Sequence, residues 1–155
     1  LFQSNGIEAI HNKRISVTGS LFRPDFLIRS TFGYIICEVD EHQHTSPGYT
    51  SDKENTRMFQ LQKDIKINNP RSQVLFIRFN PDKYNTGAVD IIERHEYLCQ
   101  TIRYCLSLPS IGVDIGVLYL FYDGFNGSPI IQMLDPSSPI GDCYGEEPIY
   151  DNPEE

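Results

Sequence analysis

The run Tyr34–Asp40, YIICEVD, constrains the fold of this chain more than any other segment. It is apolar and rich in β-branched residues until its last acids, which is typical of a buried β-strand. A second run of this kind, VLFIRF, spans Val74–Phe79. Two such strands predict a sheet in the interior of the molecule.

Helical patterns lie between and after these two strands. Ser51-Asp-Lys-Glu54 is a capping-box sequence, in which the Ser and the Glu can satisfy each other's free backbone amides. It predicts a helix over 52–67, whose inner face at helical spacing holds Met58, Leu61 and Ile65. A longer helix is predicted over 88–108, with Ile91, Leu98, Ile102 and Cys105 on its inner side.

Four further strands complete the expected order. They are predicted at 14–20, 21–28, 116–122 and 129–134, and the last two flank a Gly-rich turn typical of a hairpin. The expected order is β-β-β-α-β-α-β-β. We therefore expect an α/β domain with a central mixed sheet flanked by α-helices.

The length and the charge pattern predict one domain with a tail. A chain of 155 residues is typical of a single domain, which we place at residues 1–140. Residues 141–155 hold six acids and no Lys or Arg, and we expect them to be an acidic flexible tail. Without these six acids the net charge of −8 falls to −2, from 15 acids and 13 bases. A body so close to neutral can still carry a basic surface for nucleic acid.

Composition favours an intracellular location, in the cytoplasm or nucleus. Four cysteines without a metal-type spacing favour free thiols in a reducing compartment. No apolar run approaches the roughly 20 residues that cross a membrane, so no membrane partner is expected. The chain begins with Leu, so a targeting segment upstream would not be visible.

The chemistry of the chain is expected at three carboxylates. Asp25 lies in one predicted strand and Glu38 in the next, so a hairpin would bring them together. Glu38 and Asp40 are two positions apart on one strand, so their side chains leave the same face. Carboxylates that converge raise one another's pKa, and a cation relieves that cost. Oxygen ligands on strands suit Mg²⁺ or Mn²⁺, which can activate a water for hydrolysis.

Two other readings of the acids stay open. Asp25 alone fits a simple acid at a strand end, and Glu38 and Asp40 could instead form salt bridges with Arg23, Arg57 or Arg78. His42 and His44 follow the strand and could act as a general base or be ordinary loop residues.

With these residues in place, the chain resembles the PD-(D/E)XK nuclease superfamily. The likeness rests on Arg23-Pro-Asp-Phe26, on Glu38-Val-Asp-Glu-His-Gln-His44, on the helix with Glu54 and Arg57, and on VLFIRFN. More narrowly, it is similar to the branch related to very-short-patch-repair endonucleases. The resemblance covers about Arg23 to Tyr84.

The resemblance implies roles for individual residues. Asp25 and Glu38 would be the metal ligands of two adjacent core strands, and His44 would match the His of the repair-like branch. Arg57 would face the site and hold a phosphate. Asp40 stands where the superfamily usually has a Lys, although the repair-like branch also has an acid at this position. Asp40 would then be a third metal ligand.

Other positions depart from the family. Glu41 replaces the usual Gly, and the helix that normally precedes the core strands is short or missing, with Glu8 its only nearby acid. His44, Gln43 or Lys53 would have to substitute for the missing Lys.

The resemblance therefore predicts a Mg²⁺- or Mn²⁺-dependent endonuclease that hydrolyses phosphodiester bonds. DNA is the expected partner ahead of RNA, with the chain acting as a homodimer or within a larger protein. The missing Lys leaves an alternative open, a weak or inactive module on the same fold that binds nucleic acid or protein.

Overall fold

The computed structural model describes residues 1–15, 22–41, 51–84 and 89–134. Within these residues the elements follow the expected order, preceded by a short 3₁₀ helix. They are η1 (Gln3–Asn5), β1 (Ile10–His11), β2 (Phe26–Arg29), β3 (Gly33–Val39), α1 (Ser51–Asn68), β4 (Gln73–Phe79), α2 (Ile91–Ser107), β5 (Ile115–Leu120) and β6 (Gln132–Met133).

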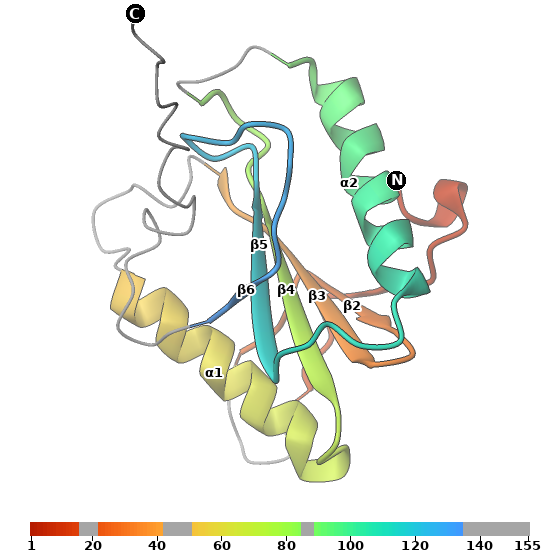
Figure 1. The fold of residues 1–155 in the computed structure, drawn as a ribbon, viewed down its shortest axis with the longest axis vertical. Coiled ribbons are helices and arrows are strands. Elements are labelled where there is room, and N and C mark those ends of the chain that lie inside the picture. The colour runs from red at the N-terminus through yellow and green to blue at the C-terminus, as the bar shows by residue number, and fades with distance from the viewer. Residues whose placement is uncertain (16–21, 42–50, 85–88, 135–155) are drawn as a thin grey trace, which may run out of the picture.

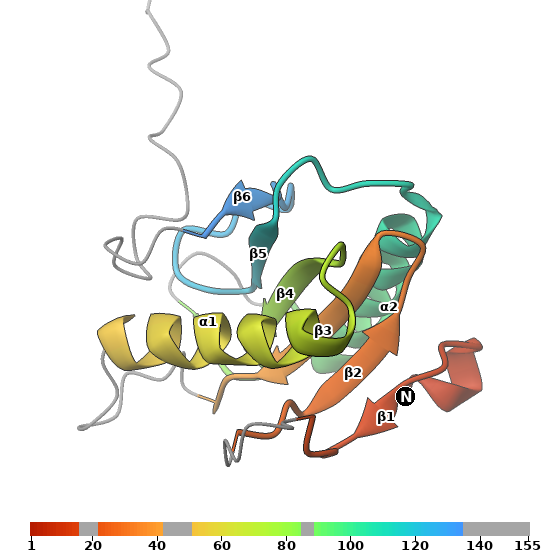
Figure 2. The same ribbon diagram turned by 90° about the horizontal axis from the view of Figure 1, so that it is seen from below.

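The strands form one mixed sheet in the order β1-β2-β3-β4-β5-β6 (Figure 1). β3, β4 and β5 are parallel, and the pairs β1–β2, β2–β3 and β5–β6 are antiparallel. The two helices cover opposite faces of the sheet (Figure 2). This confirms the expected central mixed sheet flanked by α-helices.

The interior strands alternate between two cores. Ile36 and Phe76 pack with Met58, Leu61 and Ile65 of α1, as the helical spacing predicts. Cys37 and Ile77 pack with Leu98 and Ile102 of α2 on the other face. This explains the continuous apolar runs, because a strand buried on both faces has no polar side.

The turn between β2 and β3 sets their register. Ser30 and Gly33 exchange backbone hydrogen bonds of 2.9 and 3.3 Å. Gly33 has a φ of 146°, and a Cβ there would lie 2.3 Å from the carbonyl oxygen of Gln73. Only Gly fits this close approach to β4. The resulting register pairs Phe26 with Cys37.

Three details of the structure differ from the prediction. The first strand of the described residues lies at Ile10–His11, and residues 14 and 15 are irregular, while the rest of the strand predicted at 14–20 lies outside the described residues. β2 begins only at Phe26. Ile91 is exposed because α2 begins there, capped by the Asp90 side chain, which accepts from the amide of Ile92.

The described cysteines are free and buried, namely Cys37, Cys99 and Cys105. Cys143 and the predicted tail at 141–155 are outside the described residues. Among the residues that the structure describes, no helix is long and apolar enough to cross a membrane.

Candidate functional site

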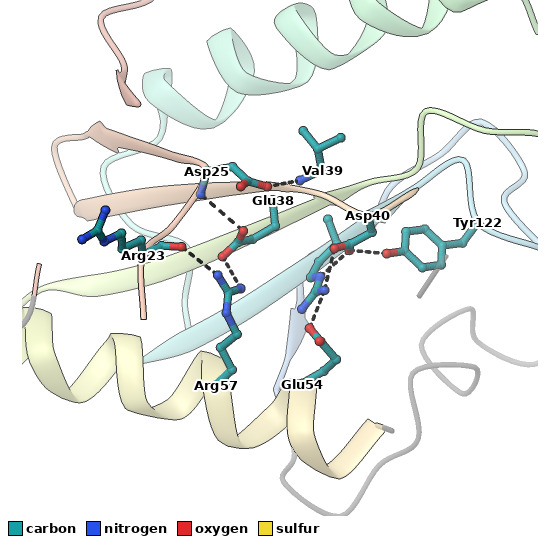
Figure 3. Close-up of polar contacts among 9 residues, drawn as sticks. Arg23, Asp25, Glu38, Val39, Asp40, Glu54, Arg57 and Tyr122 are labelled. Carbon is teal, nitrogen blue, oxygen red and sulfur yellow. Dashed lines mark hydrogen bonds and ion pairs between the residues drawn. The ribbon is translucent and has the colours of Figure 1, made fainter. Parts of the chain in front are cut away.

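Asp25 and Glu38 lie next to each other where β2 begins and β3 ends (Figure 3). The amide of Asp25 donates to Oε2 of Glu38 at 3.3 Å. The Asp25 carboxylate in turn accepts from the amide of Val39 at 2.8 Å. The hairpin therefore brings these two acids together as the sequence predicts.

Arg57 joins this pair from α1. Its Nη1 donates to Oε1 of Glu38 at 2.5 Å, and its Nη2 donates to the carbonyl oxygen of Arg23 at 2.8 Å. The guanidinium thus links α1 to β3 and to the segment that precedes β2. We call Asp25, Glu38 and Arg57 the Glu38 cluster.

Burial dominates the ionisation of Glu38. Its side chain is only 3% exposed, and burial raises its pKa from about 4.5 to about 7, although Arg57 opposes the shift. The Asp25 charge raises the pKa further. Glu38 therefore exchanges its proton near neutral pH when no cation is bound.

Asp40 belongs to a second, buried group on the same face. Arg78 donates to both of its carboxylate oxygens, from Nε at 2.5 Å and from Nη2 at 2.7 Å. The hydroxyl of Tyr122 also donates to Asp40, and Glu54 of α1 lies 2.6 Å from Nη2 of Arg78. We call Asp40, Glu54, Arg78 and Tyr122 the Arg78 cluster.

Charge pairing holds this second cluster together. Burial alone would lower the pKa of Arg78, but the charge and hydrogen bonds of Asp40 raise it well above its usual value. Burial and the Asp40 charge likewise raise the pKa of Tyr122. Arg78 therefore stays charged and Tyr122 stays a hydrogen-bond donor.

Asp40 lies in a salt bridge, and its expected role as a third metal ligand stays a prediction. Strand periodicity does place Glu38 and Asp40 on one face, but Arg78 binds Asp40 on both oxygens, which is the salt-bridge reading of this acid. Among the described residues, no group of three or more His, Cys, Asp or Glu side chains could hold a metal ion. The expected ligands that remain together are Asp25 and Glu38.

Several residues named from the sequence lie elsewhere. His42, Gln43 and His44 are outside the described residues, so the role of His44 stays a prediction. Lys53 is exposed near the start of α1, and Glu8 is exposed after η1.

Sequence reasoning missed Glu54 and Tyr122 as site residues. Glu54 reads as a helix cap, yet it lies three positions before Arg57, so both reach the sheet from one face of α1. The sequence gives no indication that Tyr122 belongs to the site, because the residue only follows an apolar strand. The expected pairing of Arg78 with an acid is confirmed.

Among the described residues, the two clusters contain four carboxylates, of Asp25, Glu38, Asp40 and Glu54, and two guanidinium groups, of Arg57 and Arg78. Asp25 and Glu38 are hard oxygen donors on rigid backbone, and Mg²⁺ is commonly held by one or two carboxylates while it keeps its waters. The two acids of the Glu38 cluster therefore fit a small divalent cation.

No protein-family model, curated protein or solved structure matches this chain.

Proposed function

We propose that this chain is a divalent-metal-dependent phosphodiester hydrolase that cuts DNA, with Asp25 and Glu38 as ligands for Mg²⁺ or Mn²⁺. The observation that carries the proposal is the hydrogen bond from the Asp25 amide to the Glu38 carboxylate, where β2 begins and β3 ends. It supports the residue roles that the resemblance implies.

The cost of keeping Glu38 charged supports a cation. A buried carboxylate beside a second one is unfavourable unless positive charge compensates both. Arg57 supplies one positive charge for two acids, and the pKa of Glu38 remains raised to about 7. A protein built for stability alone would place an apolar or neutral residue at this position.

Each residue of the Glu38 cluster has a defined part in the reaction. A bound divalent ion would polarise a phosphoryl oxygen and lower the pKa of a coordinated water. The Arg57 side chain is 23% exposed, and its guanidinium could bind a phosphate charge. The amide of Val39 orients the Asp25 carboxylate, and His44 would assist proton transfer.

A groove with three cationic residues supports nucleic acid as the substrate. Lys13, Arg14 and Arg29 line this groove of about 540 Å³ between β2 and α1, together with the acids Glu8 and Asp64. Cationic side chains bind the phosphate backbone without regard to sequence. The homodimer expected from the resemblance belongs to this proposal, because each site would cut one strand of a duplex.

Cleavage of supercoiled plasmid tests the proposal. We expect nicking that needs Mg²⁺ or Mn²⁺ and stops with EDTA. Asp25→Asn and Glu38→Gln should each lower the rate by about 100-fold or more, since each removes a ligand from the ion that carries the chemistry. Asp114→Asn is the matched control, because Asp114 is an exposed acid paired with Lys66 away from the site. Equal activity in wild type and both site variants would refute the proposal.

The identity of position 40 favours a second candidate, a weak or inactive nucleic-acid-binding module. Asp40 stands where the nuclease superfamily that the chain resembles usually has a Lys, and Arg78 binds both of its carboxylate oxygens. The Glu38 cluster itself contains no Lys among the described residues. Such a module would bind DNA equally well with EDTA and with Mg²⁺. Calorimetry that detects Mn²⁺ binding to wild type but not to Glu38→Gln would exclude it.

A further inference from the structure

A hollow lies where the turn between β2 and β3 meets the loop between α1 and β4. It has a volume of about 510 Å³, and it is lined by residues 29–34 on one side and residues 69–72 on the other. The amide of Gln73 donates to the carbonyl oxygen of Phe32 at 2.9 Å, which joins the two sides. Backbone contacts therefore hold the walls of this hollow together.

Each wall contributes one exposed arginine, and we call the site the Arg29/Arg71 hollow. Arg29 ends β2 and Arg71 precedes β4. The guanidinium carbon of Arg29 lies 5.9 Å from the centre of the Tyr34 ring, a contact that orients it. Among the described residues, neither arginine has an ion pair, and no Asp or Glu lines the hollow. Two guanidinium groups without a paired acid attract an anion.

The other polar side chains of the lining can donate hydrogen bonds. They are the hydroxyls of Ser30, Thr31 and Ser72 and the amide of Asn69. The Ser30 hydroxyl is buried and has no hydrogen-bond partner within the described part of the chain, although most buried hydroxyls have one. Phosphate offers several acceptor oxygens and binds arginine through paired hydrogen bonds. This lining therefore suits a phosphate group.

The Arg29/Arg71 hollow continues into the groove between β2 and α1. Three residues line both, namely Arg29, Tyr34 and Asn69. The groove adds two cations, Lys13 and Arg14, and two acids, Glu8 and Asp64. Asp64 is buried and accepts a hydrogen bond from Gln60 at 3.1 Å, whereas Glu8 and the four cationic residues are exposed. Cations that extend over two adjoining hollows suit a polyanion such as a nucleic-acid backbone better than one small anion.

The hollow and the Glu38 cluster lie on the same face of the sheet. Leu27 and Tyr34 pack in the core that α1 covers, and Glu38 binds Arg57 of α1. Arg29 is two positions after Leu27, so its side chain leaves the same face. Tyr34, the partner of Arg29 in the sheet, lies four positions before Glu38, which is about 13 Å of strand. Duplex DNA covers this length in about four base pairs.

We propose that the Arg29/Arg71 hollow binds a backbone phosphate of nucleic acid, about four base pairs away from the phosphate that is cut. The distance from the cut rests on the proposed function, whereas the binding of a backbone phosphate does not. Arg29 and Arg71 would pair with the phosphate oxygens, and the Ser30 hydroxyl would gain an acceptor.

Binding of duplex DNA in EDTA tests the hollow separately from catalysis. We expect the Arg29→Gln, Arg71→Gln double variant to bind a duplex of about 16 base pairs about tenfold more weakly than wild type, the size of one lost hydrogen bond to a charged group. The slope of log affinity against log salt concentration should fall by about 0.9, the value for one phosphate. Fluorescence anisotropy at several salt concentrations measures both quantities.

A second double variant, Lys63→Gln, Lys83→Gln, is the matched control. It also removes two positive charges, and both lysines are exposed and lie outside the hollow and the groove. We expect it to keep the slope of wild type. Thermal melts check the folding of both double variants, and each single arginine variant repeats the test with a smaller loss if the double variant unfolds.

Three outcomes would overturn the assignment. These are equal affinity and slope in wild type and the arginine variant, an equal loss in the lysine variant, and NMR shifts of the arginine Nε signals by inorganic phosphate without any loss of DNA affinity in the arginine variant. The last would identify a free phosphate compound as the occupant. The expected loss in a protein without metal-dependent cleavage would refute the proposed function and leave the hollow standing, and cleavage without that loss would refute the hollow alone.

Discussion

The Glu38 cluster and the Arg78 cluster lie side by side on one face of the sheet, yet they differ in every property that matters for function. Glu38 and Asp40 are two positions apart on the same chain segment, and each binds an arginine (Figure 3). Arg78 and Asp40 are almost completely buried and meet through two hydrogen bonds. Arg57 meets Glu38 through one and remains partly exposed.

This difference separates stability from chemistry. A buried pair with matched geometry is costly to break, because the partner left behind keeps an uncompensated charge. The Glu38 cluster holds a half-exposed acid, a carboxylate whose pKa is raised and an arginine within reach of solvent. Such a group lowers the stability of the fold, and functional sites commonly carry a cost of this kind. Under the proposed function, Glu38 near the end of β3 is the functional acid and Asp40 just after it is the structural one.

Asp40→Asn provides the largest test of this comparison. It removes the charge that pairs with buried Arg78, so we expect the free energy of unfolding to fall by about 3 kcal/mol or more. Urea denaturation at pH 7 measures the loss. Glu38→Gln, an equally conservative change on the same strand, should cause no comparable loss.

The activity of Asp40→Asn decides whether the separation holds. If Asp40 only supports the fold, the folded fraction of this variant should cut plasmid at a rate close to that of wild type. A rate as low as that of Asp25→Asn, at a temperature where the variant is folded, would return Asp40 to the set of metal ligands.

The pH dependence of stability is the second test, and its sign follows from the raised pKa of Glu38. The folded protein holds this proton up to about pH 7, whereas an unfolded Glu loses it near 4.5. Charging Glu38 therefore destabilises the fold progressively as pH rises through this window. The shift corresponds to about 3 kcal/mol, at about 1.4 kcal/mol per pKa unit.

Glu38→Gln isolates this effect because Gln does not titrate. With EDTA present, we expect the variant to gain about 2–3 kcal/mol over wild type between pH 4.5 and pH 8. Denaturation curves of both proteins at several pH values measure the difference. Parallel stability profiles for the two proteins would show that Glu38 carries no charging cost, and the contrast between the clusters would fail.

Much of the fold could be predicted because its signals are local. Apolar runs such as Val74–Phe79 and helical spacing such as Met58, Leu61 and Ile65 depend only on burial along one element. The first strand could not be predicted in this way. Alternation favours 14–20, but Ile10–His11 pairs with β2, and pairing at a sheet edge depends on contacts that local pattern does not encode.

The site divides in the same manner. A short turn predicts that Asp25 and Glu38 meet, because hairpin geometry is local. The partner of Asp40 depends on the parallel alignment of β3 and β4 across a helix. In that alignment Arg78 lies beside Glu38, yet its side chain reaches along the strand to Asp40. Periodicity predicts the face that a side chain occupies and leaves its partner undetermined.

Tyr122→Phe is the smallest and most selective test of the Arg78 cluster. The change removes one hydroxyl that donates to Asp40 and keeps the ring, which packs edge-on against Tyr119 at 5.1 Å. Hydrogen bonds to charged groups contribute about 1.5–3 kcal/mol, and Arg78 still binds both Asp40 oxygens, so we expect a loss of about 1–2 kcal/mol. The loss should shrink in an Asp40→Asn background, since the two residues act on one charge. Strict additivity in this double-mutant cycle would mean that Tyr122 stabilises the fold independently of Asp40. A drop in plasmid cleavage by Tyr122→Phe would mean that the Arg78 cluster also shapes the proposed metal site.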